Sequence, residues 1–142
     1  MAIEKHPASG ALRITDHKTG KPPQELPQYV AGGNLLQPLA YAMAAEVLLA
    51  APCEVSRLYY ATARGGYQEI NFKIEPRHRA FFAHAMSLID GEIERGFLPA
   101  APQPGTCNFC DYLPVCGPGE ERRAAHKNRN ALDHLQQLRN IP

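Results

Sequence analysis

The pattern of hydrophobic and polar positions divides the chain into short strand-like and helix-like segments. Residues 11–21 alternate with a period of two, which predicts a half-buried strand ending in the turn Thr19-Gly20-Lys21-Pro22-Pro23. After a loop over residues 24–33, Asn34 is expected to cap a helix that runs to about residue 51. Residues 54–74 predict a β-hairpin with Gly65-Gly66 at its turn.

The second half of the chain has a weaker pattern. Pro76 opens a predicted helix that reaches about residue 95, where Gly96 closes it. A proline-rich linker over residues 98–105 then leads to a group of cysteines. Residues 120–140 predict a final helix with few apolar positions.

Composition narrows the class of protein. The chain has 142 residues, enough for one domain, and 15 Lys and Arg against 14 Asp and Glu give a net charge of +1. The net charge therefore gives no overall attraction to nucleic acid or to a membrane, and any contact with nucleic acid must come from local patches of positive charge. No apolar run approaches the roughly 20 residues of a membrane span, and no leader opens the chain, so we expect a cytoplasmic protein without a membrane partner.

Asp16 and Lys18 form an Asp-x-Lys pair on the predicted strand. Their spacing of two places both side chains on one side of the strand. The Asp16 carboxylate and the His17 backbone carbonyl offer oxygen ligands for a divalent metal ion, and the Lys18 ammonium could orient or help deprotonate an attacking water. The alternative is an exposed strand end that carries an ordinary ion pair.

Gln37 and Tyr41 lie four residues apart at the start of the first predicted helix. They therefore share one helix face. The glutamine can hydrogen-bond a lysine or a phosphate, and the tyrosine can stack on a base or donate its hydroxyl. Tyr41 could equally be a core aromatic residue with a solvated hydroxyl.

Three cysteines, Cys107, Cys110 and Cys116, have Cys-x2-Cys-x5-Cys spacing. In a reducing compartment such thiols are more often ligands or packed side chains than disulfides. An iron–sulfur cluster or an all-cysteine zinc site needs a fourth ligand. Cys53 is more readily explained as a packed thiol, and His126 could complete a zinc site instead.

Three motifs follow one another along the chain: Asp16-His17-Lys18-Thr19-Gly20-Lys21, Leu36-Gln37-Pro38-Leu39-Ala40-Tyr41 and the cysteine motif. In this order they resemble the RecB-like group of the PD-(D/E)XK nuclease superfamily. The resemblance is greatest to AddB-type nuclease domains with an iron–sulfur staple. It implies an α/β fold: part of a restriction-endonuclease-like core, a small mixed sheet flanked by helices, over residues 1–98, and a cysteine-bearing extension over residues 99–142.

The resemblance also implies roles for single residues. Asp16, with the His17 carbonyl, would bind Mg²⁺ or Mn²⁺, and Lys18 would assist the attacking water. Gln37 and Tyr41 would support the lysine and the DNA. The three cysteines of the motif would ligate a [4Fe–4S] cluster: Cys107, Cys110 and Cys116.

The implied function is metal-dependent DNA hydrolysis in recombination or repair, within an assembly that includes a helicase or another repair subunit. Two features depart from the family pattern. Members of the family have a further metal-binding Asp, whose position here falls near Met1, where Glu4 is the only nearby acid. The family's fourth cysteine lies further upstream than that Asp. We therefore expect the C-terminal part of a larger nuclease domain, with little activity alone. The alternatives are a non-catalytic DNA-binding or scaffold module, and a small zinc or iron–sulfur structural domain.

Overall fold

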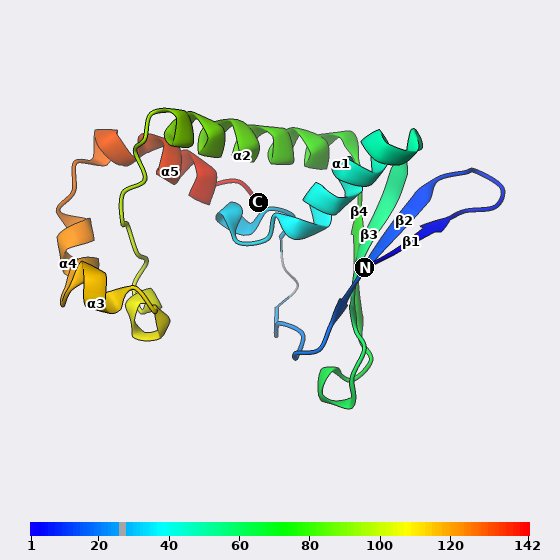
Figure 1. Cartoon of the computed structure of the whole chain (residues 1–142), viewed down its shortest axis with the longest axis horizontal. Coiled ribbons are helices and arrows are strands. Elements are labelled where there is room, and N and C mark those ends of the chain that lie inside the picture. The colour runs from blue at the N-terminus through cyan, green and yellow to red at the C-terminus, as the bar shows by residue number, and fades with distance from the viewer. Residues whose placement is uncertain (26–27) are drawn as a thin grey trace. The chain divides into compact units, whose positions relative to one another are not determined.

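The strand expected from the alternating pattern lies inside a four-stranded sheet of order β1-β2-β3-β4 (Figure 1). The computed structural model describes residues 1–25 and 28–142, residue 129 by its backbone alone, so part of the predicted loop over residues 24–33 lies outside the described residues. The strands are β1 (Ala2–Lys5), β2 (Leu12–Lys18), β3 (Cys53–Tyr60) and β4 (Glu69–Lys73). β2 and β3 are parallel and the outer pairs are antiparallel, so the sheet is mixed, as predicted.

The sheet has one apolar face because the strands alternate with a period of two. Ile14 of β2, Leu58 of β3 and Phe72 of β4 are all buried on this face. The predicted hairpin is confirmed as β3 and β4, and Gly65 and Gly66 lie in the turn between them. The alternation in β2 thus determines which of its polar side chains lie on the same face of the sheet as the core.

β1 is not expected from the pattern of its own residues. Its four residues are all exposed and show no alternation of burial. The strand is defined by its antiparallel pairing with β2, in which Glu4 lies opposite Arg13 and Ala2 lies opposite Thr15. A strand of this kind depends on its partner rather than on its own hydrophobicity.

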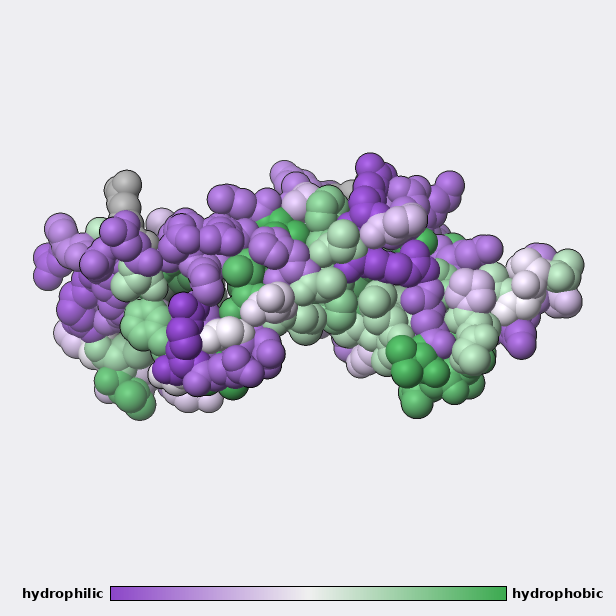
Figure 2. Space-filling model, turned by 90° about the horizontal axis from the view of Figure 1, so that it is seen from above, coloured by the Kyte–Doolittle hydropathy of each residue, from purple (hydrophilic) through white to green (hydrophobic). Residues whose placement is uncertain are grey.

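Helix α1 (Gln37–Leu49) packs against β2 and β3. Leu39 and Ala42 are fully buried, whereas Val47 and Leu48 at the end of the helix are exposed. Figure 2 shows strongly hydrophobic residues gathered at the surface over this end of α1. The helix therefore covers one face of the sheet with its first turns and leaves its last turn apolar and open.

The predicted Asn34 cap is wrong. Leu36 occupies the cap position without a side-chain hydrogen bond, and the Asn34 amide donates instead to the Ala31 carbonyl of a preceding 3₁₀ turn (2.9 Å). That local acceptor captures the side chain before the helix begins. Pro38 lies in the first turn, where its missing N–H removes no helical hydrogen bond.

The chain forms two compact units. The first comprises residues 1–87 and 138–142, and the second comprises residues 88–137. In the first unit the C-terminal segment returns to the loop before α1, where the Val30 amide donates to the Pro142 carbonyl (2.8 Å) and Ile141 is buried. Helix α2 (Pro76–Glu94) starts at Pro76, as predicted.

The second unit contains the end of α2 and a series of short helices. They are a 3₁₀ turn at Thr106–Phe109, α3 (Leu113–Cys116), α4 (Glu120–Ala125), a 3₁₀ turn at Arg129–Leu132 and α5 (Asp133–Arg139). A single helix over residues 120–140 is therefore wrong: the Asn128 side chain accepts from the Asn130 amide and starts a new turn. No helix in the described part of the chain is long and apolar enough to cross a membrane.

Candidate active site

The four residues singled out from the two motifs come together at the carboxyl end of β2. The Lys18 ammonium lies 2.7 Å from Asp16 Oδ2 and donates to Gln37 Oε1 at 2.6 Å. The Gln37 amide nitrogen in turn donates to the Tyr41 hydroxyl at 2.8 Å. The structure thus joins a strand motif and a helix motif into one continuous array of polar side chains.

Simple local geometry produces this array. Asp16 and Lys18 are two residues apart in β2, so both point to the sheet face that α1 covers. Gln37 and Tyr41 are one helical turn apart, so both lie on the face of α1 near them. Packing of the helix start against β2 then places the Gln37 amide within reach of the lysine.

One oxygen of this array is left without a hydrogen bond. Asp16 Oδ2 is buried and has no hydrogen-bond partner among the described residues, although the Lys18 ammonium lies at ion-pair distance. The two observations agree if the ammonium approaches Oδ2 closely but off the direction that a hydrogen bond requires. A buried anionic oxygen of this kind is unusual and fits a ligand for a cation.

The edge of the strand toward which the His17 backbone carbonyl points follows from its neighbour. The Lys18 carbonyl accepts from the Ala61 amide on the β3 side at 3.0 Å. Successive carbonyls of a strand point to opposite edges, so the His17 carbonyl faces the other edge, where the register of β1 ends with Ala2 opposite Thr15. The His17 carbonyl therefore points to the β1 edge of β2, and its role as a metal ligand stays a prediction.

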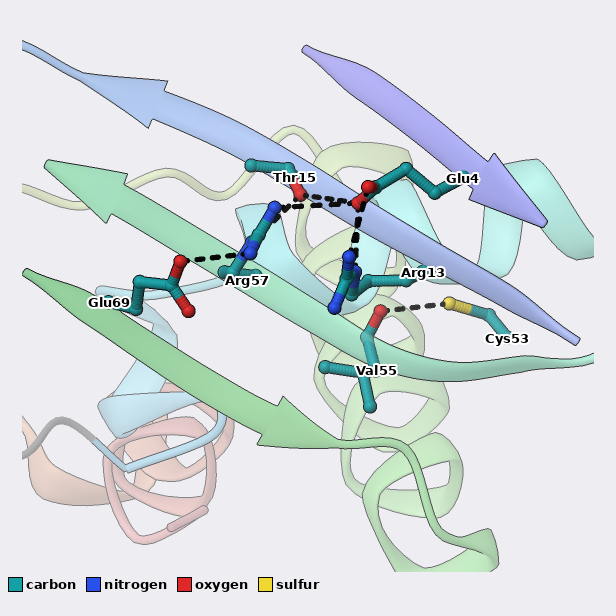
Figure 3. Close-up of polar contacts among 7 residues, drawn as sticks. All are labelled: Glu4, Arg13, Thr15, Cys53, Val55, Arg57 and Glu69. Atoms are coloured by element: carbon teal, nitrogen blue, oxygen red, sulfur yellow. Dashed lines mark hydrogen bonds and ion pairs between the residues drawn. The ribbon is translucent and has the colours of Figure 1, made fainter. Parts of the chain in front are cut away.

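Glu4, the only acid near the start of the chain, lies on the opposite face of the sheet. Its two carboxylate oxygens accept from Arg13 at 2.8 and 2.9 Å, and Arg57 approaches it at 3.4 Å (Figure 3). The hydrogen bond from Arg13 lowers the pKa of Glu4. Glu4 therefore does not supply a second carboxylate beside Asp16.

The motifs did not single out Arg57, yet it organises that opposite face. It donates to the Thr15 hydroxyl at 3.0 Å and pairs with Glu69 at 2.9 Å (Figure 3). In the sequence, the only indication of this role was that Arg57 occupies an odd-numbered position in its strand. Thr15 is 1% exposed, because this polar network covers it.

The site fits a divalent cation in part. Asp16 offers a carboxylate oxygen that accepts no hydrogen bond, but across residues 1–25 and 28–142 no group of three or more His, Cys, Asp or Glu side chains is arranged to hold a metal ion. One anionic ligand is a weak Mg²⁺ site, since Mg²⁺ gives up its water reluctantly. A further acid is needed to complete it.

The cysteine motif lies in the second unit. Cys107, Cys110 and Cys116 line one hollow of about 400 Å³ together with apolar residues such as Leu98 and Val115. The Cys107 amide donates to the Glu121 carboxylate at 3.1 Å. Partial burial, Glu121 and the other two thiols all raise the pKa of Cys107. The three thiols thus share one hollow without forming a ligand set in the described structure.

Cys53 has the character of a packed thiol. It is 1% exposed, and its sulfur donates to the Val55 carbonyl at 3.5 Å (Figure 3). Burial raises its pKa, so the thiolate that a metal would need is disfavoured. This environment matches the packed role expected for Cys53.

Comparison with known proteins places this geometry in a family. A search of curated proteins and of solved structures finds no match to the chain. The model of the PD-(D/E)XK nuclease superfamily matches residues 3–117, which include most of β1, the Asp16–Tyr41 array and the cysteine motif. The mixed sheet with its flanking helices is consistent with the restriction-endonuclease-like fold that the resemblance implied. The chain belongs to the PD-(D/E)XK nuclease superfamily.

Proposed function

We propose that this chain carries the lysine-bearing part of an active site for metal-dependent hydrolysis of DNA. The observation that supports this most is the array from Asp16 through Lys18 and Gln37 to Tyr41, in which one buried Asp16 oxygen accepts no hydrogen bond from the described residues. Membership of the superfamily indicates nuclease activity and a DNA substrate. In an ordinary ion pair a buried carboxylate oxygen would also accept a hydrogen bond, whereas Asp16 Oδ2 accepts none from the described residues.

Each residue has a distinct task in this proposal. Nucleases of this superfamily generally use divalent metals such as Mg²⁺, and Asp16 with the His17 carbonyl would hold Mg²⁺ or Mn²⁺ here. The bound ion would polarise the phosphate and lower the pKa of a water. Lys18 has three N–H donors, and its hydrogen bond to Gln37 uses one of them, so a donor remains to orient the attacking water.

Gln37 and Tyr41 hold the lysine in place. The Gln37 oxygen accepts from Lys18 while its amide nitrogen donates to Tyr41, which fixes the amide orientation. With the glutamine fixed, the ammonium loses rotational freedom before substrate binds. Pre-orientation of this kind lowers the barrier by holding reacting groups near their final geometry.

The missing acid has a defined place in the sheet. Continuing the antiparallel register of β1 by one residue puts position 1 opposite Asp16, on the same face of the sheet. Position 1 is Met in this chain. We therefore expect the chain by itself to show little hydrolysis with Mg²⁺ or Mn²⁺, and an acid at position 1 to increase it.

A gain-of-function experiment tests the proposal. Met1→Asp, expressed behind an added initiator methionine, should raise Mn²⁺-dependent degradation of labelled DNA by at least about 100-fold over the unmodified chain. Adding Lys18→Ala should abolish that gain, whereas Glu4→Gln should leave it unchanged. Robust degradation by the unmodified chain, or a gain that survives Lys18→Ala, would contradict the proposal.

The non-catalytic alternative, a DNA-binding or scaffold module, has one observation in its favour. The described residues present a single carboxylate at the site and no three-ligand group. The same experiment separates the two readings: a scaffold that has lost its chemistry would gain no hydrolysis from Met1→Asp while keeping its affinity for DNA.

We also propose a RecB-like role in recombination or repair in the cytoplasm, with a helicase or another repair subunit as partner. The order of the Asp-x-Lys, Gln-x3-Tyr and cysteine motifs supports this assignment. Affinity purification of the chain from its own cells, followed by identification of the bound proteins, tests it. Recovery of no helicase or repair protein would count against the assembly.

For the cysteines we propose three ligands of a [4Fe–4S] cluster whose fourth ligand lies outside this set. Their common hollow supports the grouping. An iron left open by three thiolates is labile, so the isolated chain should hold no intact cluster. Anaerobic reconstitution, read by visible absorbance and iron analysis, tests this. A stable four-iron cluster that is lost in Cys53→Ser would overturn it and make Cys53 a ligand.

A further inference from the structure

The loop that joins β3 to β4 is hydrogen-bonded to the end of β2, the strand that carries Asp16 and Lys18. This loop, residues 61–68, follows Tyr60, which lies opposite Lys18 in the parallel register. The Ala61 amide donates to the Lys18 carbonyl at 3.0 Å, and the Thr62 hydroxyl donates to the Thr19 carbonyl at 3.3 Å. Figure 1 shows the loop projecting beyond the ends of β2 and β3. Carboxyl ends of parallel strands are where ligands of open α/β sheets bind.

Gly65 fixes how closely the loop approaches that strand. A Cβ atom at Gly65 would lie 2.7 Å from Tyr60 Cβ and 2.9 Å from the Gly20 carbonyl oxygen. Both distances are too short for any larger residue without movement of the backbone. The Gly65 amide also donates to the Thr62 hydroxyl at 3.1 Å, which closes the turn. The loop is therefore held firmly beside the residues that follow Lys18.

The tip of the loop presents a cation and an aromatic ring to solvent. Arg64 is exposed and makes no hydrogen bond or ion pair with the residues that the structure describes. Tyr67 is 61% exposed and has a φ of +53°, a backbone conformation that a tyrosine rarely adopts. Strained, exposed side chains that the fold itself does not use are typical of binding positions.

The chemistry of this pair matches one strand of nucleic acid. A guanidinium binds phosphate oxygens through paired N–H donors, and an exposed tyrosine ring stacks on a base. Stacking requires an open base face, which an unpaired nucleotide offers and the interior of a duplex does not. A net charge of only +1 means that attraction for DNA must come from such local groups.

We propose that the loop over residues 61–68 binds an unpaired strand of DNA next to the site, with Arg64 on a backbone phosphate and Tyr67 stacked on a base. The proposal assigns a DNA contact to a loop and to two residues that the proposed function does not use, and its link to hydrolysis rests on that function.

Fluorescence anisotropy with a fluorescein-labelled 20-nucleotide single strand, in EDTA and over a series of salt concentrations, tests the contacts. Arg64→Gln should weaken binding and reduce the slope of log affinity against log salt by about 0.7, the share of one phosphate. Tyr67→Asn removes the ring and tolerates the positive φ, so it should weaken binding by about 5-fold or more without changing the slope. Lys73→Gln, at the far end of β4, removes the same charge as a matched control and should have no effect.

A blunt duplex of the same sequence provides the second arm. Tyr67→Asn should leave duplex binding unchanged, because no base face is available. The proposal is overturned if the unmodified chain does not bind the single strand, or if Arg64→Gln and Tyr67→Asn bind it like the unmodified chain. Loss of binding in both loop variants supports the proposal even if Met1→Asp confers no hydrolysis. Conversely, hydrolysis that depends on Lys18 but ignores the loop would support the proposed function and reject this inference.

Discussion

The two faces of the sheet carry ion pairs that look alike by distance but differ in completeness. Lys18 and Asp16 lie 2.7 Å apart on the face toward α1, and Arg13 and Glu4 lie 2.8 Å apart on the opposite face. On the opposite face both oxygens of Glu4 accept hydrogen bonds. On the α1 face one buried Asp16 oxygen has no hydrogen-bond partner in the described structure.

This difference teaches what separates a structural ion pair from a candidate site. A short distance between charges contributes little to stability at an exposed surface and indicates no chemistry. An anionic oxygen that is buried yet unsatisfied is different, because the fold stabilises it incompletely and another group can bind it. The two faces can be compared directly, since they share β2.

The largest expected difference between the faces is in metal binding. In the Met1→Asp chain, Asp16→Asn should weaken Mn²⁺ binding by at least about 10-fold, because it removes an anionic ligand. Glu4→Gln removes an equal charge from the other face and should leave the affinity unchanged. Electron paramagnetic resonance of free Mn²⁺ measures both. Equal losses in the two variants would show that the faces are not distinct in this respect.

The next largest effect concerns the free energy of unfolding, and it should be greatest for substitutions on the face of the sheet that carries Arg13 and Glu4. Arg57→Met should lower the free energy of unfolding by about 1–2 kcal/mol, because it leaves the buried Thr15 hydroxyl with fewer partners and frees two acids. The expected loss is small because Glu4 and Glu69 are close to half exposed, so water and salt screen their charges. Urea unfolding measures it. A loss below about 0.5 kcal/mol would mean that the network contributes nothing beyond an ordinary surface.

The two sides of the sheet should also lose stability in different pH ranges. On the α1 side, His78 stacks on Tyr29, and burial lowers the pKa of His78. As pH falls, this histidine therefore takes up a proton in the unfolded chain before it does so in the folded chain. The free energy of unfolding should accordingly fall as pH drops below about 6.5. The pKa of Glu4 is lowered by Arg13, so its contribution is present above about 4.5 and is lost as pH falls further.

Urea midpoints between pH 3 and 8 would resolve the two ranges. His78→Phe should flatten the upper one and Glu4→Gln the lower one, each without affecting the other. A single range that responds to both substitutions would contradict this separation.

The smallest expected effect is that of Arg13→Gln. Its side chain is 47% exposed, and exposed pairs contribute about 0–1 kcal/mol, so the free energy of unfolding should change by no more than about 0.5 kcal/mol. The same urea measurement applies, and added salt should reduce the difference further. A loss as large as that of Arg57→Met would mean that the bidentate pair, rather than Arg57, holds the network together.

The sequence predicted those features that local geometry determines. Spacings of two and four placed Asp16 with Lys18 and Gln37 with Tyr41, because strand and helix periods are nearly invariant. The resemblance to a family supplied the expectation that the two pairs meet, and the contact between Lys18 and Gln37 shows that they do. The catalytic roles of these residues stay predictions.

Features that depend on a partner were not predictable. β1 is exposed along its whole length and exists through its pairing with β2. The Asn34 side chain had a competing acceptor in Ala31, and Asn128 divides the tail helix through a bond to its own neighbour. The unsatisfied Asp16 oxygen results from the direction of the Lys18 ammonium, which residue spacing does not determine.

The register of β1 has a consequence for how such a site is gained and lost in evolution. Ile3 lies opposite Ile14 and faces the core side, whereas Glu4 lies opposite Arg13 and faces away. An exchange of Glu for Asp at position 4 would therefore preserve an acid in the strand without moving it toward Asp16. Acids at odd positions of β1 face the α1 side. Relatives of this chain are then best sorted by whether the acid in this strand occupies an odd or an even position. A count of nearby acids would group intact and defective sites together.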